Sequence, residues 1–191
     1  MKRLVNKKSI KILAICSILV ISVICFLYSL KYPVTCKISG IVISTFSDND
    51  KNDESYVKDS LKDGQLFYNT DEVLSDNISD YVHIIYFCKF KNNCFSLINS
   101  IYCIVNSVPE NDSSFISAHR HGFPSQTALF MSTKVRCHVL MNRKGLTDEE
   151  LYEKIKSVEL DVIYKHKGEA GEVEVKGIDS LDFDDIVWSK K

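Results

Sequence analysis

Residues 81–90, YVHIIYFCKF, decide the fold of this chain. The segment is apolar on both alternating faces, with Ile85 and Phe87 on one side and Val82 and Ile84 on the other. A strand that is apolar on both faces belongs in the middle of a sheet or beneath a second layer. The pattern therefore predicts a central strand of a mainly-β domain.

The segments around this strand also alternate with a period of two. Residues 35–46 are rich in β-branched side chains, which favour a strand. Residues 95–105 are expected to pair with residues 81–90 as a hairpin, because Asn92 and Asn93 between them tolerate the backbone of a tight turn. Further strands are expected at residues 114–119 and 128–141, and a second hairpin joins residues 160–165 to 172–175 across residues 168–171.

One short helix is predicted at residues 148–157. Thr147 is a good N-cap, and Glu150 lies three residues later, which completes a capping box. Leu151 and Ile155 would face the core at i, i+4 spacing. Strands with one connecting helix indicate a β-sandwich, with an immunoglobulin-like arrangement as one form and an α+β fold as the alternative.

An uncharged segment, ILAICSILVISVICFLYSL, begins at Ile12 and ends at Leu30. A helix of this length spans roughly 28 Å, which nearly matches a hydrocarbon core about 30 Å thick. We therefore predict a single-pass transmembrane signal-anchor helix at residues 12–30, between a basic stub at residues 1–11 and a β-rich ectodomain at residues 31–191. The alternatives are a buried helix of a soluble protein and a cleaved signal peptide. The apolar run is long for a signal peptide, and Leu27 occupies the place of a small residue before Ser29.

The charge distribution orients this anchor. The 191 residues carry 24 basic and 25 acidic side chains, and five of the basic ones lie in residues 1–11. The ectodomain keeps 19 basic against 25 acidic side chains, about −6. Because positive charge stays on the cytoplasmic side, we expect the N-terminus in the cytoplasm and the C-terminal domain outside the cell membrane. An acidic ectodomain also argues against nucleic acid as a partner.

Acidic residues are concentrated at residues 47–80, where ten carboxylates meet only three lysines. We expect an acidic, mobile insertion with short structured pieces around Tyr56 and residues 66–68. Part of it superficially matches a calcium loop through Asp48, Asp50, Asn52 and Glu54. Asp53 replaces the glycine needed at the sixth position and Asp59 the glutamate at the twelfth, so a solvated loop is favoured. The late acids Asp179, Asp182, Asp184 and Asp185 are interpreted as a solvated tail.

Five cysteines lie outside the predicted membrane segment, and export to an oxidising space would permit disulfides between them. The predicted hairpin would place Cys88 opposite Cys94, which makes this pair the first candidate. Cys36 with Cys103 or Cys137 is the second candidate. The remaining alternative is five reduced, buried thiols.

Three histidines are candidate ligands for a zinc site, but the signal is weak. His119 and His121 would share one face of a strand, and His138 or Cys137 could add a further zinc ligand. Surface or hydrogen-bonded histidines are the favoured interpretation, because no established zinc motif accompanies them. A Cys137 nucleophile assisted by His138 is weaker still, since strand neighbours point to opposite faces.

No catalytic residue is predicted, because phosphate-binding loops, dinucleotide fingerprints and nucleophile elbows are absent from the sequence. We expect the external domain to be a binding or interaction module for a protein or envelope component that is cationic or bridged by an ion. The alternatives are a membrane-anchored metal-dependent hydrolase using His119 and His121, and a structural subunit of an envelope complex. No resident cofactor is expected, with zinc or calcium as the minor alternatives.

Overall fold

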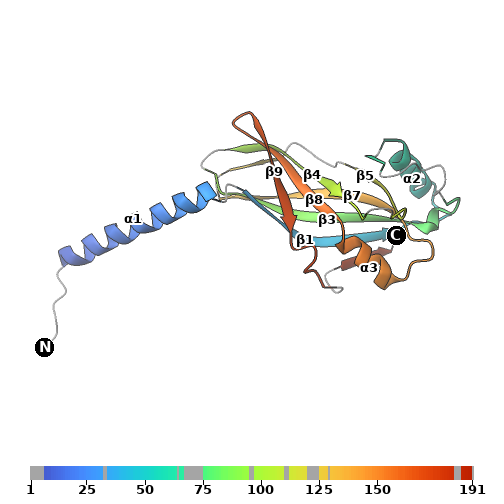
Figure 1. Ribbon diagram of the computed structural model, residues 1–191, viewed down its shortest axis with the longest axis horizontal. Helices are drawn as coiled ribbons and strands as arrows, with labels where there is room; N and C mark the ends of the chain where they lie inside the picture. The colour runs from blue at the N-terminus through green and yellow to red at the C-terminus, as the bar shows by residue number, and fades with distance from the viewer. Residues whose placement is uncertain are drawn as a thin grey trace.

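The computed structural model describes residues 7–31, 34–63, 65–66, 75–94, 97–109, 112–119, 125–128, 130–182 and 186–190. It shows a mainly-β domain preceded by one long apolar helix, α1 (Lys7–Lys31), which projects from one end of the domain (Figure 1). The other elements are β1 (Val34–Thr45), α2 (Lys51–Asp63), β2 (Gln65–Leu66), the 3-10 turn η2 (Ile78–Asp80), β3 (Tyr81–Asn92), β4 (Ile98–Ser107), β5 (Phe115–His119), β6 (Ser125–Thr127), β7 (Ser132–Asn142), α3 (Asp148–Lys156), β8 (Glu159–His166), β9 (Glu169–Lys176) and β10 (Ile186–Lys190).

Strand β3 is central, as its two apolar faces predicted. It pairs antiparallel with β1 on one side and with β7 on the other. Tyr86 and Phe90 on its inner face are fully buried in the main core. On the opposite face Tyr81 packs with Val57 of α2 and Leu140 of β7 in a second buried cluster.

The strands form a single sheet in the order β2-β5-β7-β3-β1-β9-β8-β4-β6, with β10 added parallel to β1. The sheet is open and curls over its own inner face, so that strands distant in this order come together. The Cys88 sulfur on β3 lies 3.8 Å from the Cys103 sulfur on β4, although three strands separate them in the sheet order. A β-sandwich or immunoglobulin-like arrangement is not confirmed, because the path from β2 to β6 is one continuous sheet.

The two predicted hairpins had different outcomes. The β8–β9 hairpin is confirmed, but its turn is shorter than the expected residues 168–171, because His166 pairs with Glu169. The turn residues Lys167 and Gly168 have φ angles of 53° and 88°, the positive values of a type I′ turn. The hairpin of residues 81–105 is wrong. Both strands exist, but β3 pairs with β1 and β7, whereas β4 pairs with β6 and β8. Because β1 and β7 occupy both edges of β3, β4 cannot pair with β3 and joins the far part of the sheet, between β8 and β6.

The predicted helix is confirmed as α3, which begins with a complete capping box. The Thr147 hydroxyl accepts from the Glu150 amide at 3.2 Å, and the Glu150 carboxylate accepts from the Thr147 amide at 2.8 Å. Leu151 and Ile155 are buried. The Tyr86 hydroxyl of β3 donates to the Ile155 carbonyl at 3.0 Å, which ties the end of this helix to the central strand.

The acidic range at residues 47–80 contains more regular structure than expected. Tyr56 lies in the 13-residue helix α2, and the short strand β2 pairs with β5. Residues 67–74 lie outside the described part of the chain. Near the C-terminus, the residues after the expected acidic tail form β10, which extends one edge of β1.

The capping box yields a direct test of α3. Thr147→Ala should lower the free energy of unfolding by about 1 kcal/mol, because one helix amide loses its acceptor. Urea denaturation of the full chain in detergent, followed by circular dichroism, measures the change. Thr147→Ser is the matched control, since it keeps the hydroxyl, and a loss as large as that of the alanine variant would contradict this role.

Candidate functional site

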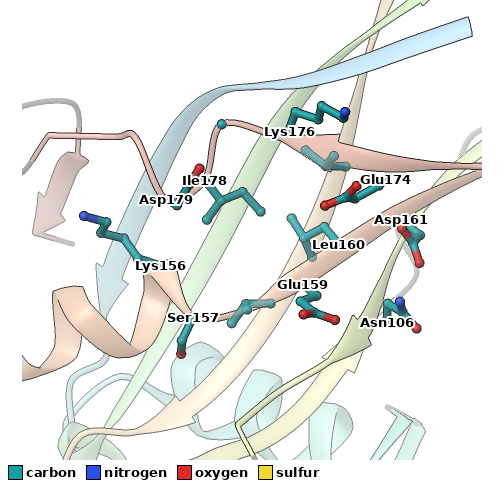
Figure 2. A pocket seen from close by; sticks show the side chains of 13 residues that line it. Asn106, Lys156, Ser157, Glu159, Leu160, Asp161, Glu174, Lys176, Ile178 and Asp179 are labelled. Atoms are coloured by element: carbon teal, nitrogen blue, oxygen red, sulfur yellow. The ribbon is translucent and has the colours of Figure 1, made fainter.

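A pocket of about 680 Å³ lies where β8 and β9 meet the C-terminal end of α3 (Figure 2). Its apolar wall comes from residues that also belong to the main core, including Leu160, Val175 and Ile178. The loop after β9 and the end of β4 complete the lining through Gly177 and Asn106. The pocket therefore combines an apolar floor with residues from three separate segments of the chain, at position 106, 156–161 and 174–179.

Charged side chains surround this floor. The lining includes four carboxylates and two ammonium groups, namely Glu159, Asp161, Glu174 and Asp179 with Lys156 and Lys176. Figure 2 shows Lys156 and Asp179 toward one end of the pocket and Asp161 and Asn106 toward the other. The excess of carboxylates favours a cationic ligand over an anionic one.

Asp161 is the most constrained of these carboxylates. It lies directly opposite Glu174 in the β8–β9 ladder and is only 7% exposed. Burial raises the pKa of Asp161, and the negative charges of Glu172, Glu174 and Glu159 raise it further. A cation in the pocket would reduce the repulsion between Asp161 and its neighbouring carboxylates, so these charges would favour a cationic ligand.

Two backbone irregularities shape the pocket. Asn106 is an extra residue in β4, because Val105 pairs with Leu160 whereas Ser107 pairs with the preceding residue, Glu159. Such a bulge bends the strand and redirects its side chains. Gly177 has a φ angle of 90°, a left-handed conformation that glycine adopts without strain, and it turns the chain at the end of β9.

The predicted zinc ligands are not assembled into a metal site in the described part of the structure. His119 of β5 is partly buried and pairs in register with His138 of β7, while His121 lies outside the described residues. No group of three or more potential ligands that could hold a metal ion occurs among the described residues. The proposed Cys137–His138 nucleophile gains no support, since contact with Cys103 and burial leave the Cys137 thiol with a raised pKa.

His138 instead belongs to a network that sequence reasoning missed. Its Nδ1 atom lies 2.9 Å from Nε2 of His83, and the same His83 atom lies 2.9 Å from the Tyr56 hydroxyl. Phe46 stacks on His83 and contacts Tyr56, with ring centroids 6.5 and 5.6 Å away. These contacts attach α2 to the outer face of β3, which indicates a structural role for the histidine pair.

The superficial calcium loop also has a structural explanation. Asp48 accepts hydrogen bonds from the Ser79 amide and hydroxyl at 2.8 and 2.7 Å, which lower the pKa of its carboxyl group. Asp50 accepts from the Asn52 amide at 2.8 Å at the start of α2, and the buried Asp53 accepts from the Ser47 amide at 3.0 Å. The carboxylates thus serve different local hydrogen bonds rather than converging on one point.

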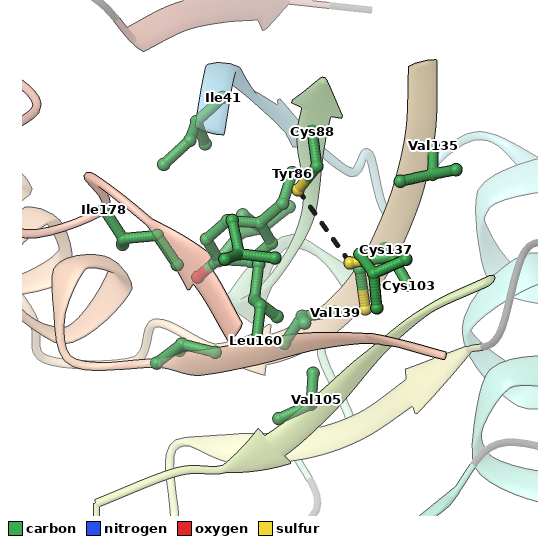
Figure 3. Packing of buried hydrophobic residues seen from close by; sticks show 14 of the residues in the cluster. Ile41, Tyr86, Cys88, Cys103, Val105, Val135, Cys137, Val139, Leu160 and Ile178 are labelled. Carbon is green, nitrogen blue, oxygen red and sulfur yellow. Dashed lines mark hydrogen bonds between the residues drawn. The ribbon is translucent and has the colours of Figure 1, made fainter. Parts of the chain in front are cut away.

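Four of the five cysteines outside α1, Cys36, Cys88, Cys103 and Cys137, are buried in one cluster inside the curl of the sheet, and Figure 3 shows the last three of them. Cys88 contacts both Cys36 and Cys103, and Cys103 also contacts Cys137. The predicted disulfides are not supported, because no cysteine pair lies at bonding distance and all seven are free. Cys88 and Cys94 are not opposite one another, since the hairpin that would align them does not form.

The environment of Cys88, Cys103 and Cys137 raises the pKa of each thiol and so favours its protonated form. The hydrogen bond from Cys103 favours the Cys88 thiolate, but the contact with Cys36 and burial outweigh it, so the pKa of Cys88 is raised. The pKa of Cys103 is likewise raised, since its contact with Cys88 and burial outweigh the hydrogen bond with Cys137. Because the thiolate is the reactive form, these cysteines should be inert in the folded protein.

The pocket residues were not singled out from the sequence, apart from Asp179 in the expected acidic tail. The alternation of Glu172, Glu174 and Lys176 along β9 indicates one exposed face, but it does not show that Asp161 lies opposite. His83 had no motif to mark it either. Its position one residue from Val82 only places it on the other face of β3.

No protein-family model matches the sequence, and no curated protein matches it. Among solved structures, YcdA of Bacillus subtilis, provisionally described as a lipoprotein, is similar over 80% of this chain and 38% of its own, with 13% identity and a TM-score of 0.32. A protein from Archaeoglobus fulgidus is similar over 52% of this chain and 81% of its own, with 14% identity and a TM-score of 0.28. This chain spans less than half of the Bacillus protein, and likenesses this weak assign neither family nor function.

The raised pKa of Asp161 predicts a stability effect with a definite sign. Asp161→Asn should raise the free energy of unfolding at neutral pH, because it removes a buried negative charge beside Glu172 and Glu174. The difference should shrink as the pH falls through the raised pKa toward the unfolded value near 3.8, where the wild-type carboxyl is protonated. Denaturation between pH 7 and pH 4 measures it. Asp179→Asn, at an exposed position of the same pocket, should change stability little, and an equal gain there would contradict the explanation.

The absence of a bonded cysteine pair predicts five free thiols in the β domain. Iodoacetamide at pH 8 should label the four clustered cysteines slowly in the native protein and completely in urea, because all four are buried and inaccessible to the reagent until the domain unfolds. Mass spectrometry of peptides should count the same number of labels with and without prior reduction. Two fewer labels without reduction would reveal a disulfide and contradict the reduced cluster.

Proposed function

We propose that this protein is a single-pass, membrane-anchored binding module whose external β domain captures a cationic group in the β8–β9 pocket. The observation that carries the proposal is the excess of carboxylates around an apolar floor, with Asp161 held among three other acids. The ligand we infer is a protein or envelope component that presents positive charge. Binding through a divalent ion is the related alternative.

Helix α1 supports the anchor. Its segment Ile10–Tyr28 is long and apolar enough to cross a membrane, and none of it is buried against the domain. A core helix of a soluble protein would be covered, so the lack of burial disfavours that alternative. The Ser17 and Ser22 hydroxyls donate to the carbonyls of Leu13 and Ile18 at 2.9 and 2.8 Å. Each hydroxyl therefore has a hydrogen-bond partner within the helix, as a polar group in the hydrocarbon core requires.

The orientation is inferred from charge. Five basic residues precede the apolar segment, and this excess keeps the N-terminus in the cytoplasm. The domain that follows would then lie outside the cell membrane. Its net charge of about −6 would attract cationic partners to the surface before the pocket selects among them.

Site-specific photocrosslinking in native membranes tests the binding proposal. A p-benzoylphenylalanine at the exposed pocket residue Asn106 should yield a discrete adduct, which mass spectrometry can identify. The adduct should weaken in 1 M salt, where the Debye length falls to about 3 Å. It should also weaken in an Asp161→Asn, Glu174→Gln background, because the pocket then loses two carboxylates.

The matched control carries the same photoreactive residue at Val187 on β10, which is 59% exposed and lies outside the pocket. An identical adduct from both positions, or an adduct from Asn106 that persists in the double variant, would contradict capture by the pocket. A protein whose mature N-terminus begins beyond residue 28 would contradict the anchor and leave the pocket hypothesis standing.

A further inference from the structure

The end of the domain next to α1 must lie close to the membrane if α1 is an anchor, and the inference below rests on that proposed function. Helix α1 ends at Lys31 and β1 begins at Val34. Three successive Cα steps separate these residues, so they can be at most about 11 Å apart. Whatever the tilt of α1, the start of β1 therefore lies within this distance of the end of the helix.

Register brings two loops to the same end. Val34 pairs with Asn92 at the end of β3. The Asn92 amide donates to the Met131 carbonyl at 3.1 Å, and the Phe130 amide donates to the Asn92 carbonyl at 2.8 Å. The Asn92 side chain holds both loops, since its Nδ2 donates to the Thr127 carbonyl at 3.0 Å and its Oδ1 accepts from the amide of Cys94 at 2.7 Å. One fully buried asparagine thus anchors the loops before β4 and before β7.

These loops expose large apolar side chains. Outside α1, the exposed large hydrophobic residues of the described chain are Leu97 at 50%, Phe130 at 48%, Met131 at 60% and Val187 at 59%. The first three lie at the end next to α1, and we call them the apolar rim. Phe130 has a φ angle of 58°, a strained conformation for a bulky residue. Several large apolar side chains exposed at one end of a domain are typical of an interaction surface.

The charge of this end is opposite to that of the domain. We counted charges among the five residues nearest this end on each of the strands β1, β3, β4, β7, β8 and β9, and in the β8–β9 turn. Seven exposed side chains in this set are basic and two are acidic. They are Lys37, Lys89, Lys91, Lys134, Arg136, Lys165 and Lys167 against Glu169 and Glu172. Figure 1 shows the tip of the β8–β9 hairpin at the end of the domain where α1 joins. Basic side chains around apolar ones suit an anionic lipid surface.

We propose that the apolar rim and its surrounding basic side chains seat this end of the domain on the bilayer that α1 spans, at the level of anionic phospholipid headgroups. The occupant is the membrane because Val34, three residues after the end of α1, pairs with Asn92, whose backbone is hydrogen-bonded to Phe130 and Met131 of the rim. Seating would restrict the tilt of the domain and hold the acidic pocket at a defined height above the surface.

Tryptophan quenching in the full chain tests this seating. The protein has one tryptophan, Trp188, which pairs with Ile43. Ile43 lies nine residue steps along β1 from Val34, about 30 Å along the strand. Full-length Phe130→Trp in a Trp188→Phe background would be reconstituted into vesicles of phosphatidylcholine and phosphatidylglycerol with brominated acyl chains. We expect a blue-shifted emission and a loss of fluorescence relative to unbrominated vesicles, with a smaller loss when phosphatidylglycerol is omitted.

The matched control is Val187→Trp in the same background, since Val187 is at least as exposed as Phe130 but far from the rim. Its fluorescence should be unaffected by bromine, as should that of Trp188 in the wild-type chain. Equal quenching at both positions would overturn the proposal, because the domain would then lie on its side. Protection of the Phe130→Trp fluorophore from both bromine and acrylamide would also overturn it, by showing that a second copy of the chain covers the rim.

Flotation of the vesicles separates the two hypotheses. Protein that does not float with the vesicles contradicts the anchor itself, whereas a Phe130→Trp protein that floats with unquenched fluorescence contradicts only the seating. Met131→Trp repeats the measurement if the Phe130 variant does not fold. If Trp188→Phe does not fold, Phe130→Trp is compared directly with the wild-type chain, whose native tryptophan supplies the constant background.

Discussion

The burial of the inner face of β3, together with the Tyr81 end of its outer face, is the constraint on which the rest of this structure depends. Its inner face holds Tyr86 and Phe90 in the main core, and its outer face holds Tyr81 in the second cluster. Burying the outer face requires α2, and burying the inner face requires the sheet to curl until β4 and β8 cover it. The Tyr86 hydroxyl links this central strand to α3, so both helices of the domain are positioned by the same strand.

The polar features of the domain are separated according to their environment. The four clustered thiols lie inside the curl, where they are buried away from solvent. Carboxylates gather instead at the pocket beside α3, where Asp161 experiences the charges of its neighbours. Basic side chains concentrate at the end of the domain next to α1. A net charge of about −6 is therefore an average over surfaces of opposite sign.

Local sequence signals predicted those elements whose stability is local. Thr147 and Glu150 form their capping box within one turn, and the β8–β9 hairpin closes between adjacent strands, although its turn lies at residues 167–168 rather than at the predicted 168–171. The hairpin of residues 81–105 failed for the opposite reason. Alternation shows which face of a strand is buried, but it does not show which strand lies at its edge. The expected Cys88–Cys94 pair depended on that edge and failed with it.

The sequence by itself determined the apolar helix at the N-terminus, the dominance of strands and the central place of β3. These follow from hydrophobicity and its period within short segments. Only the tertiary structure decided that four cysteines meet, that His83 contacts His138 and that acids from β8 and β9 share a pocket with Asn106. Those arrangements depend on contacts between residues far apart in the chain, and the curl of the sheet sets them rather than any local pattern.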